Sequence, residues 1–452
     1  MKDQVPDLLR GHDADYVEAH LEERESTHIT YRNGCLEEVN RSYSSGGNAR
    51  ALVRGGWGFV TFDGSQDLRD KVALVVREAR LAGTGPLRLP ESEAAAATVA
   101  VRVERDATTL PLEQKKALLD QYSDIMMSTG RTRNARIDYR DSKRRTIFAS
   151  SEGHYIEQSM PDLSLRLTAI ARQDSEVQQS GLSLGSNGEF SAIEGLHDKV
   201  RDLAERASAL LSAGQVKGGE YTVIVDPVLA GVFAHEAFGH LSESDFVYQN
   251  DRLRELMTLG RRFGGHQLNI VDDPTWSGLR GSYRYDDEGT RASRTYLIRE
   301  GILTGRLHSR QTAAKMGERT TGNARAISYR YPPIVRMSNT YIENGDATFD
   351  DMIADVREGV YVKNWYGGMT SLEMFTFSAG EAYMIRDGRI AEMLKPVVLS
   401  GNVFVTLQNI DAVGNDLEMN QGGGCGKGGQ SPLPVSNGSP HLRIRNCLVG
   451  GA

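Results

Sequence analysis

Residues 221–240 read YTVIVDPVLAGVFAHEAFGH, and this stretch decides how the second half of the chain folds. Its first five residues, 221–225, are apolar or β-branched, which predicts a buried strand. Asp226 and Pro227 then form a helix-capping pair, with proline in the first helical turn. Apolar residues recur at helical spacing from Val228 to Phe233. The sequence therefore predicts a strand, a cap and a helix that together make a rigid framework for the polar residues at its end.

The helix ends in the pattern H-E-x-x-x-H, formed by His235, Glu236 and His240. Two neutral nitrogen ligands beside a carboxylate are the parts needed to hold a divalent metal and to activate a water. The alternative is a pair of packed, hydrogen-bonded core histidines. A chance occurrence of the pattern is expected in on the order of one chain in a hundred. Because an ordered strand–cap–helix unit precedes the pattern, we favour the metal site.

The spacing of the two histidines predicts an irregular helix. It is one residue longer than the H-E-x-x-H of common zinc proteases. Residues five apart on a regular helix differ by roughly 140°, so the side chains of His235 and His240 would point to different sides. A π-bulge would bring them together, and so would a helix that loosens at Gly239. We therefore expect a bent or bulged helix beneath the site.

A third ligand has to come from elsewhere, and the three cysteines offer one candidate. Cys35 and Cys447 lie in strand-like segments and are expected to be packing residues. Cys425 lies in the glycine-rich segment 421–430, whose backbone can approach a site closely, and Lys427 would favour its thiolate. Two histidines, a cysteine and a water make an acceptable open zinc site. The alternative is a flexible loop with an incidental thiol.

Several further motifs follow in the second half of the chain. They are Glu243 and Asp245, Asp272-Asp273-Pro274, Asp286-Asp287-Glu288-Gly289, Thr321-Gly322-Asn323-Ala324-Arg325, Arg336-Met337-Ser338-Asn339-Thr340 and Cys425-Gly426-Lys427-Gly428-Gly429-Gln430. With the histidine motif before them, these blocks resemble the TldD branch of the TldD/PmbA peptidases. The resemblance implies that His235, His240 and Cys425 bind zinc and that Glu236 serves the catalytic water.

The resemblance also implies an activity and a partner. The other branch of the family, PmbA or TldE, lacks the histidine motif, so this chain resembles the catalytic subunit of a zinc metallopeptidase. The implied substrates are small, unstructured peptides, and the implied partner is a TldE- or PmbA-like subunit or a second copy of the chain. Two other functions remain open: a non-hydrolytic peptide-tailoring metalloenzyme, and a binding subunit with structural zinc. Structural zinc normally has four protein ligands, whereas only three are well placed here.

Two groups of acidic residues each allow a functional and a structural interpretation. Glu243 and Asp245, which follow the motif, could orient one of its histidines, or they could simply solvate the end of the helix. The cluster from Asp286 to Glu288 could mimic a metal site, but Gly289 directly after it favours a hairpin turn.

Composition fits an ordinary soluble protein of two or three domains, with 39% hydrophobic and 25% charged residues among 452. A net charge of −7 argues against binding to nucleic acid or to a membrane surface. The start of the chain does not resemble a signal peptide, and no apolar run approaches the length of a membrane span. Three scattered cysteines give no disulfide framework, so we expect a reducing cytoplasm.

The pattern of elements predicts an α+β fold in two parts. Residues 1–215 are expected to form antiparallel sheets with helices, either as one unit or as two modules, about 1–95 and 96–215. The expected helices of this part are residues 67–81, 111–127 and 196–211. Residues 220–452 are expected to form a mainly antiparallel β domain that carries the metal-site helix, with one further helix near 349–358.

Overall fold

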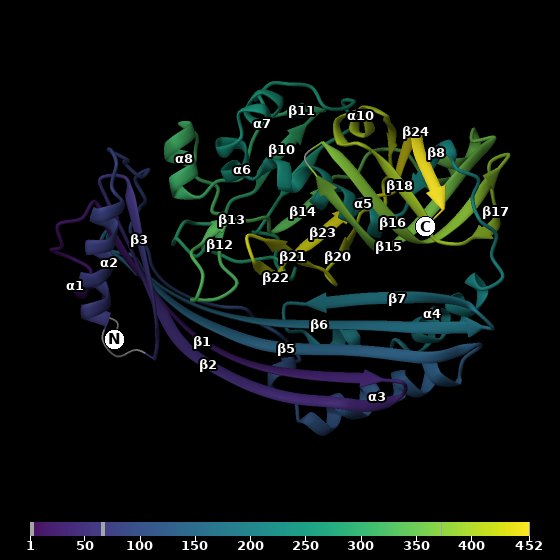
Figure 1. Ribbon diagram of the computed structural model, residues 1–452, viewed down its shortest axis with the longest axis horizontal. Coiled ribbons are helices and arrows are strands. Elements are labelled where there is room, and N and C mark those ends of the chain that lie inside the picture. The colour runs from purple at the N-terminus through teal and green to yellow at the C-terminus, as the bar shows by residue number, and fades with distance from the viewer. Residues whose placement is uncertain (1–3, 65–67, 372, 452) are drawn as a thin grey trace.

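The computed structural model describes residues 4–64, 68–371 and 373–451. It is a mixed α/β structure in which the N-terminal part forms one long, bent sheet and the C-terminal part lies on the inner side of the bend (Figure 1). This arrangement confirms the α+β fold class that the sequence predicts. The helices of the described chain are all too short or too polar to cross a lipid bilayer.

The N-terminal sheet has seven strands in the order β3-β2-β1-β5-β6-β4, and β7 pairs with the remaining length of β6. All neighbours are antiparallel except β4 and β6. The strands are β1 (Tyr16–Arg32), β2 (Cys35–Val53), β3 (Gly56–Asp63), β4 (Ala96–Ala100), β5 (Thr132–Ser150), β6 (Tyr155–Gln173) and β7 (Glu176–Ser186). A single continuous sheet thus replaces the several sheets that the sequence suggested.

Side chains along β1 alternate between the two faces of this sheet, one covered by helices and the other turned toward the C-terminal part. Val17, Ala19 and Ile29 are buried in two apolar clusters beneath the helices. Glu18 and Glu22 project to the opposite face, toward the C-terminal part, because successive side chains of a strand alternate. The helices are α1 (Gln4–Leu8), α2 (Leu68–Ala82), η1 (Ala107–Thr109), α3 (Leu112–Ser128), η2 (Phe190–Ile193) and α4 (His197–Leu210). They confirm the three expected helices, although residue 67 lies outside the described residues.

One C-terminal sheet closes on itself. Its order is β15-β8-β24-β18-β16-β17, β19 pairs with β24, and β15 also pairs with β16, so five strands form a ring. The strands are β8 (Gly219–Val225), β15 (Glu358–Ser371), β16 (Met374–Arg386), β17 (Arg389–Leu394), β18 (Val397–Asn402), β19 (Ile410–Val413) and β24 (Leu442–Gly451). The predicted strand at residues 221–225 is therefore part of β8, which lies in the ring between β15 and β24.

The other C-terminal sheet runs β11-β10-β9-β14-β23-β20, and two short hairpins, β12–β13 and β21–β22, stand apart. These strands are β9 (Ile270–Asp272), β10 (Thr295–Arg299), β11 (Ile302–Leu303), β12 (Ala324–Arg325), β13 (Ile334–Val335), β14 (Asn339–Ile342), β20 (Glu418–Asn420), β21 (Gly424–Lys427), β22 (Gln430–Pro434) and β23 (Ser436–Ser439). The helices of this half are α5 (Pro227–Phe233), η3 (Ala234–Gly239), η4 (His240–Ser242), α6 (Ser244–Gln249), α7 (Asp251–Leu256), α8 (Arg310–Met316), α9 (Phe349–Ala354) and α10 (Val403–Gln408).

Helix α5 packs against strands of both C-terminal sheets, β15 of the ring and β23 of the open sheet. Leu229 and Phe233 belong to the largest apolar cluster of the molecule, where Phe233 meets the rings of Phe375 and Phe377 edge-on. Full burial of such side chains stabilises by roughly 1.5–3 kcal/mol each. The metal-site motif therefore follows a helix that is anchored in the core.

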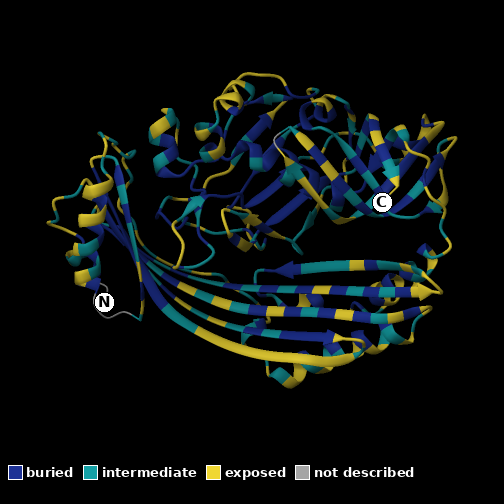
Figure 2. Ribbon diagram, viewed as in Figure 1, coloured by how far each residue is buried: buried dark blue, intermediate teal, exposed yellow. Residues whose placement is uncertain are grey.

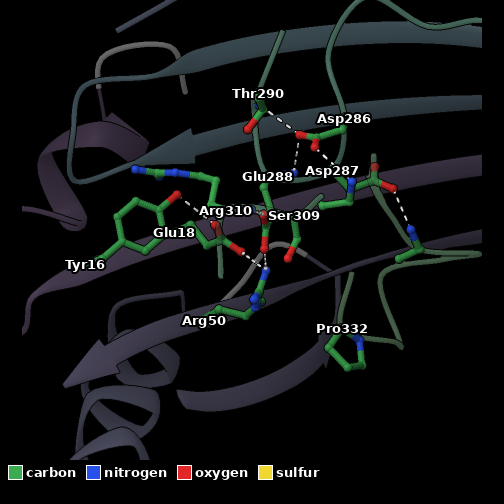
Figure 3. A network of polar contacts seen from close by, with 12 residues as sticks. Tyr16, Glu18, Arg50, Asp286, Asp287, Glu288, Thr290, Ser309, Arg310 and Pro332 are labelled. Atoms are coloured by element: carbon green, nitrogen blue, oxygen red, sulfur yellow. Dashed lines mark hydrogen bonds and ion pairs between the residues drawn. The ribbon is translucent and has the colours of Figure 1, made fainter. Parts of the chain in front are cut away.

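Charged residues join the N-terminal sheet to the C-terminal part. Arg50 of β2 contacts both Glu18 (2.8 Å) and Glu288 (3.2 Å), and all three side chains are buried (Figure 3). Glu288 lies in the turn predicted from Asp286 to Gly289, which a hydrogen bond from the Gly289 amide to the Asp286 carbonyl closes. Figure 2 shows that much of β2 is exposed. Buried ion pairs of this kind contribute little net stability, but a buried charge left without its partner is strongly destabilising. The pairs therefore favour the arrangement in which the two parts of the chain meet at these residues.

Candidate metal centre

The histidine motif sits on an irregular helix. Asp226 caps α5 by accepting a hydrogen bond from the Leu229 amide at 2.9 Å, as its position before Pro227 predicts. After α5 the backbone widens into the π-helix η3, and the His240 amide donates to the His235 carbonyl five residues back. This confirms the irregularity that the spacing predicts. The two imidazole rings consequently lie side by side, with ring centroids 5.3 Å apart.

Gly239 lets this widened turn pack closely against its neighbour. A Cβ at this position would lie 2.0 Å from the Sδ atom of Met337, far inside van der Waals contact. Met337 itself is fully buried in the same apolar cluster as α5. Glycine is therefore favoured here because it leaves space for Met337, and not because of an unusual backbone angle.

Three candidate ligands converge at this point. Suitable ligand atoms of His235, His240 and Cys425 all lie within 4.8 Å of one another, and no other such group of three occurs among the described residues. The Sγ atom of Cys425 is 3.5 Å from Nε2 of His240. Neither ring nitrogen of His235 has a hydrogen-bond partner in the described chain, although both are buried. Buried polar atoms are nearly always satisfied, so these nitrogens point to a missing partner.

The electrostatics of the three groups fit a cation. Burial raises the pKa of the Cys425 thiol, but the two imidazoles outweigh burial and lower that pKa to about 5. Burial likewise lowers the pKa of His240, but Glu243 and Cys425 raise it well above its ordinary value. The site thus stabilises a thiolate and positive charge together, which is what a divalent metal on these atoms would supply. The sequence suggested Lys427 as the group that favours the thiolate; the imidazoles have this effect instead.

Glu236 lies at the edge of the same group. Its Oε2 atom is 3.9 Å from Nε2 of His240, and about a third of its side chain is exposed (33%). His235 and Glu236 border a cavity of about 710 Å³, with residues 179–185 of β7 and residues 418–424 among its walls. Gly422 approaches β7 so closely that a Cβ there would lie 2.2 Å from the Ser183 carbonyl oxygen.

One of the two acidic residues after the motif contacts a candidate ligand. Nδ1 of His240 is 2.9 Å from Oε2 of Glu243, which is completely buried. Asp245 contacts Lys427 instead. Only Glu243 is therefore placed to orient a histidine from behind, as carboxylates commonly do at metal sites.

Family models match almost the whole of this structure. Models described as the PmbA/TldA metallopeptidase domain 1, central domain and C-terminal domain match residues 17–82, 105–211 and 218–451, respectively. The chain belongs to the PmbA/TldD metallopeptidase family. The last of the three matches contains the histidine motif and Cys425.

Individual proteins of the PmbA/TldD family agree with this assignment. A metalloprotease of Synechocystis is 44% identical over 100% of this chain and 98% of its own length. A zinc metalloprotease TldD homolog of Saccharolobus solfataricus is 31% identical, covering 91% of each chain. The crystal structure of TldE from Thermococcus kodakarensis has the same fold, with a TM-score of 0.75, 17% identity and 97% coverage of each chain.

In this member of the PmbA/TldD family, two arginines hold the hairpin that carries Cys425, and the sequence alone does not indicate this role. Arg336 is fully buried and donates to the carbonyl oxygens of Cys425 (2.8 Å) and Gln430 (3.2 Å). Arg325 donates to the Pro434 carbonyl at 2.8 Å. Both arginines belong to the motif blocks at 321–325 and 336–340, which were the only signal for them.

Arg280 holds the segment before the hairpin. It donates to the carbonyl oxygens of Gln421 (3.2 Å) and Gly423 (2.6 Å), and it also pairs with Asp162 of β6. A glycine-rich segment has few side chains of its own to bury. Its carbonyl groups are fixed instead by cations from other parts of the chain.

The other two cysteines lie away from the centre. Cys447 is buried in the ring of strands, and burial raises its pKa to about 12, so the prediction of a packing residue is confirmed. The same prediction for Cys35 is wrong. Cys35 is exposed, because β3 covers the edge of β2 only from Gly46 onward.

Proposed function

We propose that this chain is a zinc-dependent peptidase that hydrolyses unstructured peptides, with His235, His240 and Cys425 as zinc ligands and Glu236 as the general base. The observation that carries the proposal is the convergence of two imidazoles and a thiolate beside a carboxylate that opens into a cavity. With three protein ligands, one coordination position is left for a water or a substrate. A structural zinc site would normally have a fourth protein ligand.

The bound zinc, Glu236 and Glu243 would have separate roles in hydrolysis. When bound, zinc would supply Lewis acidity, which lowers the pKa of a water to ~7 and polarises a carbonyl group. Glu236 accepts the proton of the attacking water and passes it to the leaving amine, since its carboxylate is beside His240 and open to the cavity. Glu243 holds the ring of His240 in one orientation.

The peptide binds as an extended strand. Strand β7 pairs only with β6, so within the described residues its other edge is unpaired, and residues 179–185 of that strand line the cavity. An added strand satisfies backbone donors and acceptors without requiring particular side chains. This mode admits many sequences but excludes folded proteins, whose backbones are already paired.

The assembly and the compartment are also part of the proposal. A TldE- or PmbA-like subunit, or a second copy of this chain, pairs with it and encloses the peptide. Support comes from the shared fold of TldE from Thermococcus kodakarensis. A reducing cytoplasm suits the three free cysteines, because oxidation of Cys425 would remove a ligand.

The deciding experiment measures zinc and hydrolysis together. Purified protein should hold about one zinc per chain, and product masses should show cleavage of an unstructured polypeptide, tested with and without a TldE-like partner. Glu236→Ala should keep the zinc and lose activity by about 10²- to 10⁴-fold, since the base moves a proton and does not hold the metal.

Four results would count against this function. Wild-type turnover in Glu236→Ala would overturn the role of the base. Zinc without any hydrolysis would favour a structural site, and a mass change without cleavage would favour a tailoring enzyme. Equal cleavage of one polypeptide in its folded form and as a destabilised, unfolded variant would overturn the strand-binding cavity.

A further inference from the structure

Lys427 lies two residues after Cys425 on strand β21 and is almost entirely buried, with 7% of its side chain exposed. Its ammonium group is 3.0 Å from Oε2 of Glu243 and 2.6 Å from Oδ1 of Asp245, and it donates to the Val335 carbonyl at 2.8 Å. The lysine on the cysteine hairpin thus points its charge at the acidic residues that follow the histidine motif, and not into the open cavity.

Glu243 connects this lysine to a candidate ligand. The same oxygen, Oε2, receives Lys427 at 3.0 Å and Nδ1 of His240 at 2.9 Å. With Nδ1 occupied by the carboxylate, Nε2 of His240 is the nitrogen that faces Cys425. The hydrogen bond at one ring nitrogen fixes which nitrogen is free to bind a metal.

A buried carboxylate with only one partner would be costly, because charge is poorly solvated in the interior. Lys427 offsets that cost for Glu243, and the ring of Phe246 covers the ammonium group at 4.3 Å. The ion pair also spans two segments that are 184 residues apart in sequence, Glu243 and Lys427. It therefore holds the cysteine hairpin against the histidine helix.

We propose that Lys427 is a positioning residue of the metal centre, which acts through Glu243 to orient His240 and to keep Cys425 within reach of both histidines. The inference rests on the proposed zinc site and deepens it. It predicts that zinc is held more weakly when the charge of Lys427 is removed, even where the fold is intact. Loss of such an outer partner typically costs about 10- to 100-fold in metal affinity.

The test measures zinc transfer from the loaded protein to an excess of a coloured chelator, together with the melting temperature. Lys427→Met should lose zinc about 10- to 100-fold faster than the wild type, and Lys427→Arg should recover most of the difference. Lys427→Gln removes the charge but keeps a donor, and it provides the measurement if Lys427→Met does not fold. Lys115→Met is the matched control, since Lys115 forms a buried pair with Asp141 far from the centre.

The control separates stability from metal binding. Lys115→Met should lower the melting temperature and leave the rate of zinc loss unchanged. If Lys427→Gln loses zinc no faster than the wild type, the inference is wrong while the zinc site stands. If the wild type itself binds no zinc, the proposed function fails first.

A double variant tests the route through Glu243. If Lys427 acts on His240 by way of this carboxylate, Lys427→Met in a Glu243→Gln background should add little to the effect of Glu243→Gln alone. Two effects that multiply in full would show that Lys427 acts by another route, which overturns the positioning role.

Discussion

The helix that carries His235 and His240 and the hairpin that carries Cys425 meet at one centre, but different forces hold them. The helix is capped by Asp226 and anchored by buried apolar side chains of the core. The hairpin has few side chains to bury, and arginines such as Arg336 fix its carbonyl groups. The comparison indicates that a chain can build half of a metal site from a local pattern and the other half only when the rest of the fold is present.

The largest expected effect tests whether the hairpin supplies a ligand at all. Cys425→Ala should lose most of its zinc, because the two imidazoles that remain make a poor site. Metal analysis after dialysis measures this. Cys447→Ala is the matched control: it also removes a buried thiol from the same apolar cluster, but should keep its zinc. Full zinc occupancy in Cys425→Ala would remove the hairpin from the centre.

The second prediction concerns Arg336, whose hydrogen bonds hold the cysteine hairpin, and it leaves all three proposed ligands in place. Arg336→Met takes the donors from the carbonyls of Cys425 and Gln430, and each buried acceptor left unpaired costs about 1–3 kcal/mol. We expect zinc affinity to fall by about 10- to 100-fold, as for other outer partners. Competition with a chelator measures the affinity. Unchanged zinc affinity in a folded Arg336→Met protein would mean that the hairpin keeps its shape without the hydrogen bonds from Arg336.

The same contrast explains what the sequence could predict. The cap at Asp226, the irregular helix and the closeness of His235 and His240 follow from spacing within 20 residues of sequence. Cys425 was identified by its glycine neighbours and by the family resemblance. The role of Arg336 was not predictable, because an arginine that binds a carbonyl 89 residues away leaves no local pattern.

Two wrong predictions, the end of one helix and the burial of Cys35, also have physical reasons. The helix expected at 349–358 ends at Ala354. The prediction ran too far because Val356 continues the apolar spacing and is buried in the same cluster as the helix, although it lies outside it. The exposure of Cys35 depends on where β3 stops covering β2, which is a property of the sheet and not of the residues around Cys35. The division into domains 1–215 and 220–452 stays a prediction.

The third prediction concerns the cap of the histidine helix and its dependence on pH. Burial raises the pKa of Asp226 to about 6, against the hydrogen bonds from Leu229 and Asn364 that lower it. Between pH 4 and pH 6 the unfolded carboxyl ionises while the folded one keeps its proton, so stability falls as pH rises. With an ordinary pKa of ~3.9 for the unfolded carboxyl, the loss amounts to about 3 kcal/mol.

Asp226→Asn isolates this contribution, because asparagine caps a helix as well as aspartate does but carries no charge. In chelator-treated protein, the melting temperature of the variant relative to the wild type should rise from pH 4 to pH 6 and then level off. Removing the metal from both proteins keeps zinc release out of the comparison. A difference that stays constant across this range would mean that Asp226 is ionised throughout.

The smallest expected effect concerns the packing of the π-helix. Gly239→Ala places a methyl group against Met337, and overpacking of this kind costs about 1–3 kcal/mol. The value should lie near the lower end, since the nearest atom, Sδ, belongs to a flexible side chain. The melting temperature should therefore fall by a few degrees while zinc content stays near one per chain. Met337→Val in the same protein should recover part of the loss by making room for the methyl group. If zinc is lost along with stability in Gly239→Ala, the histidine helix is no more robust than the hairpin, and the contrast between the two halves of the centre fails.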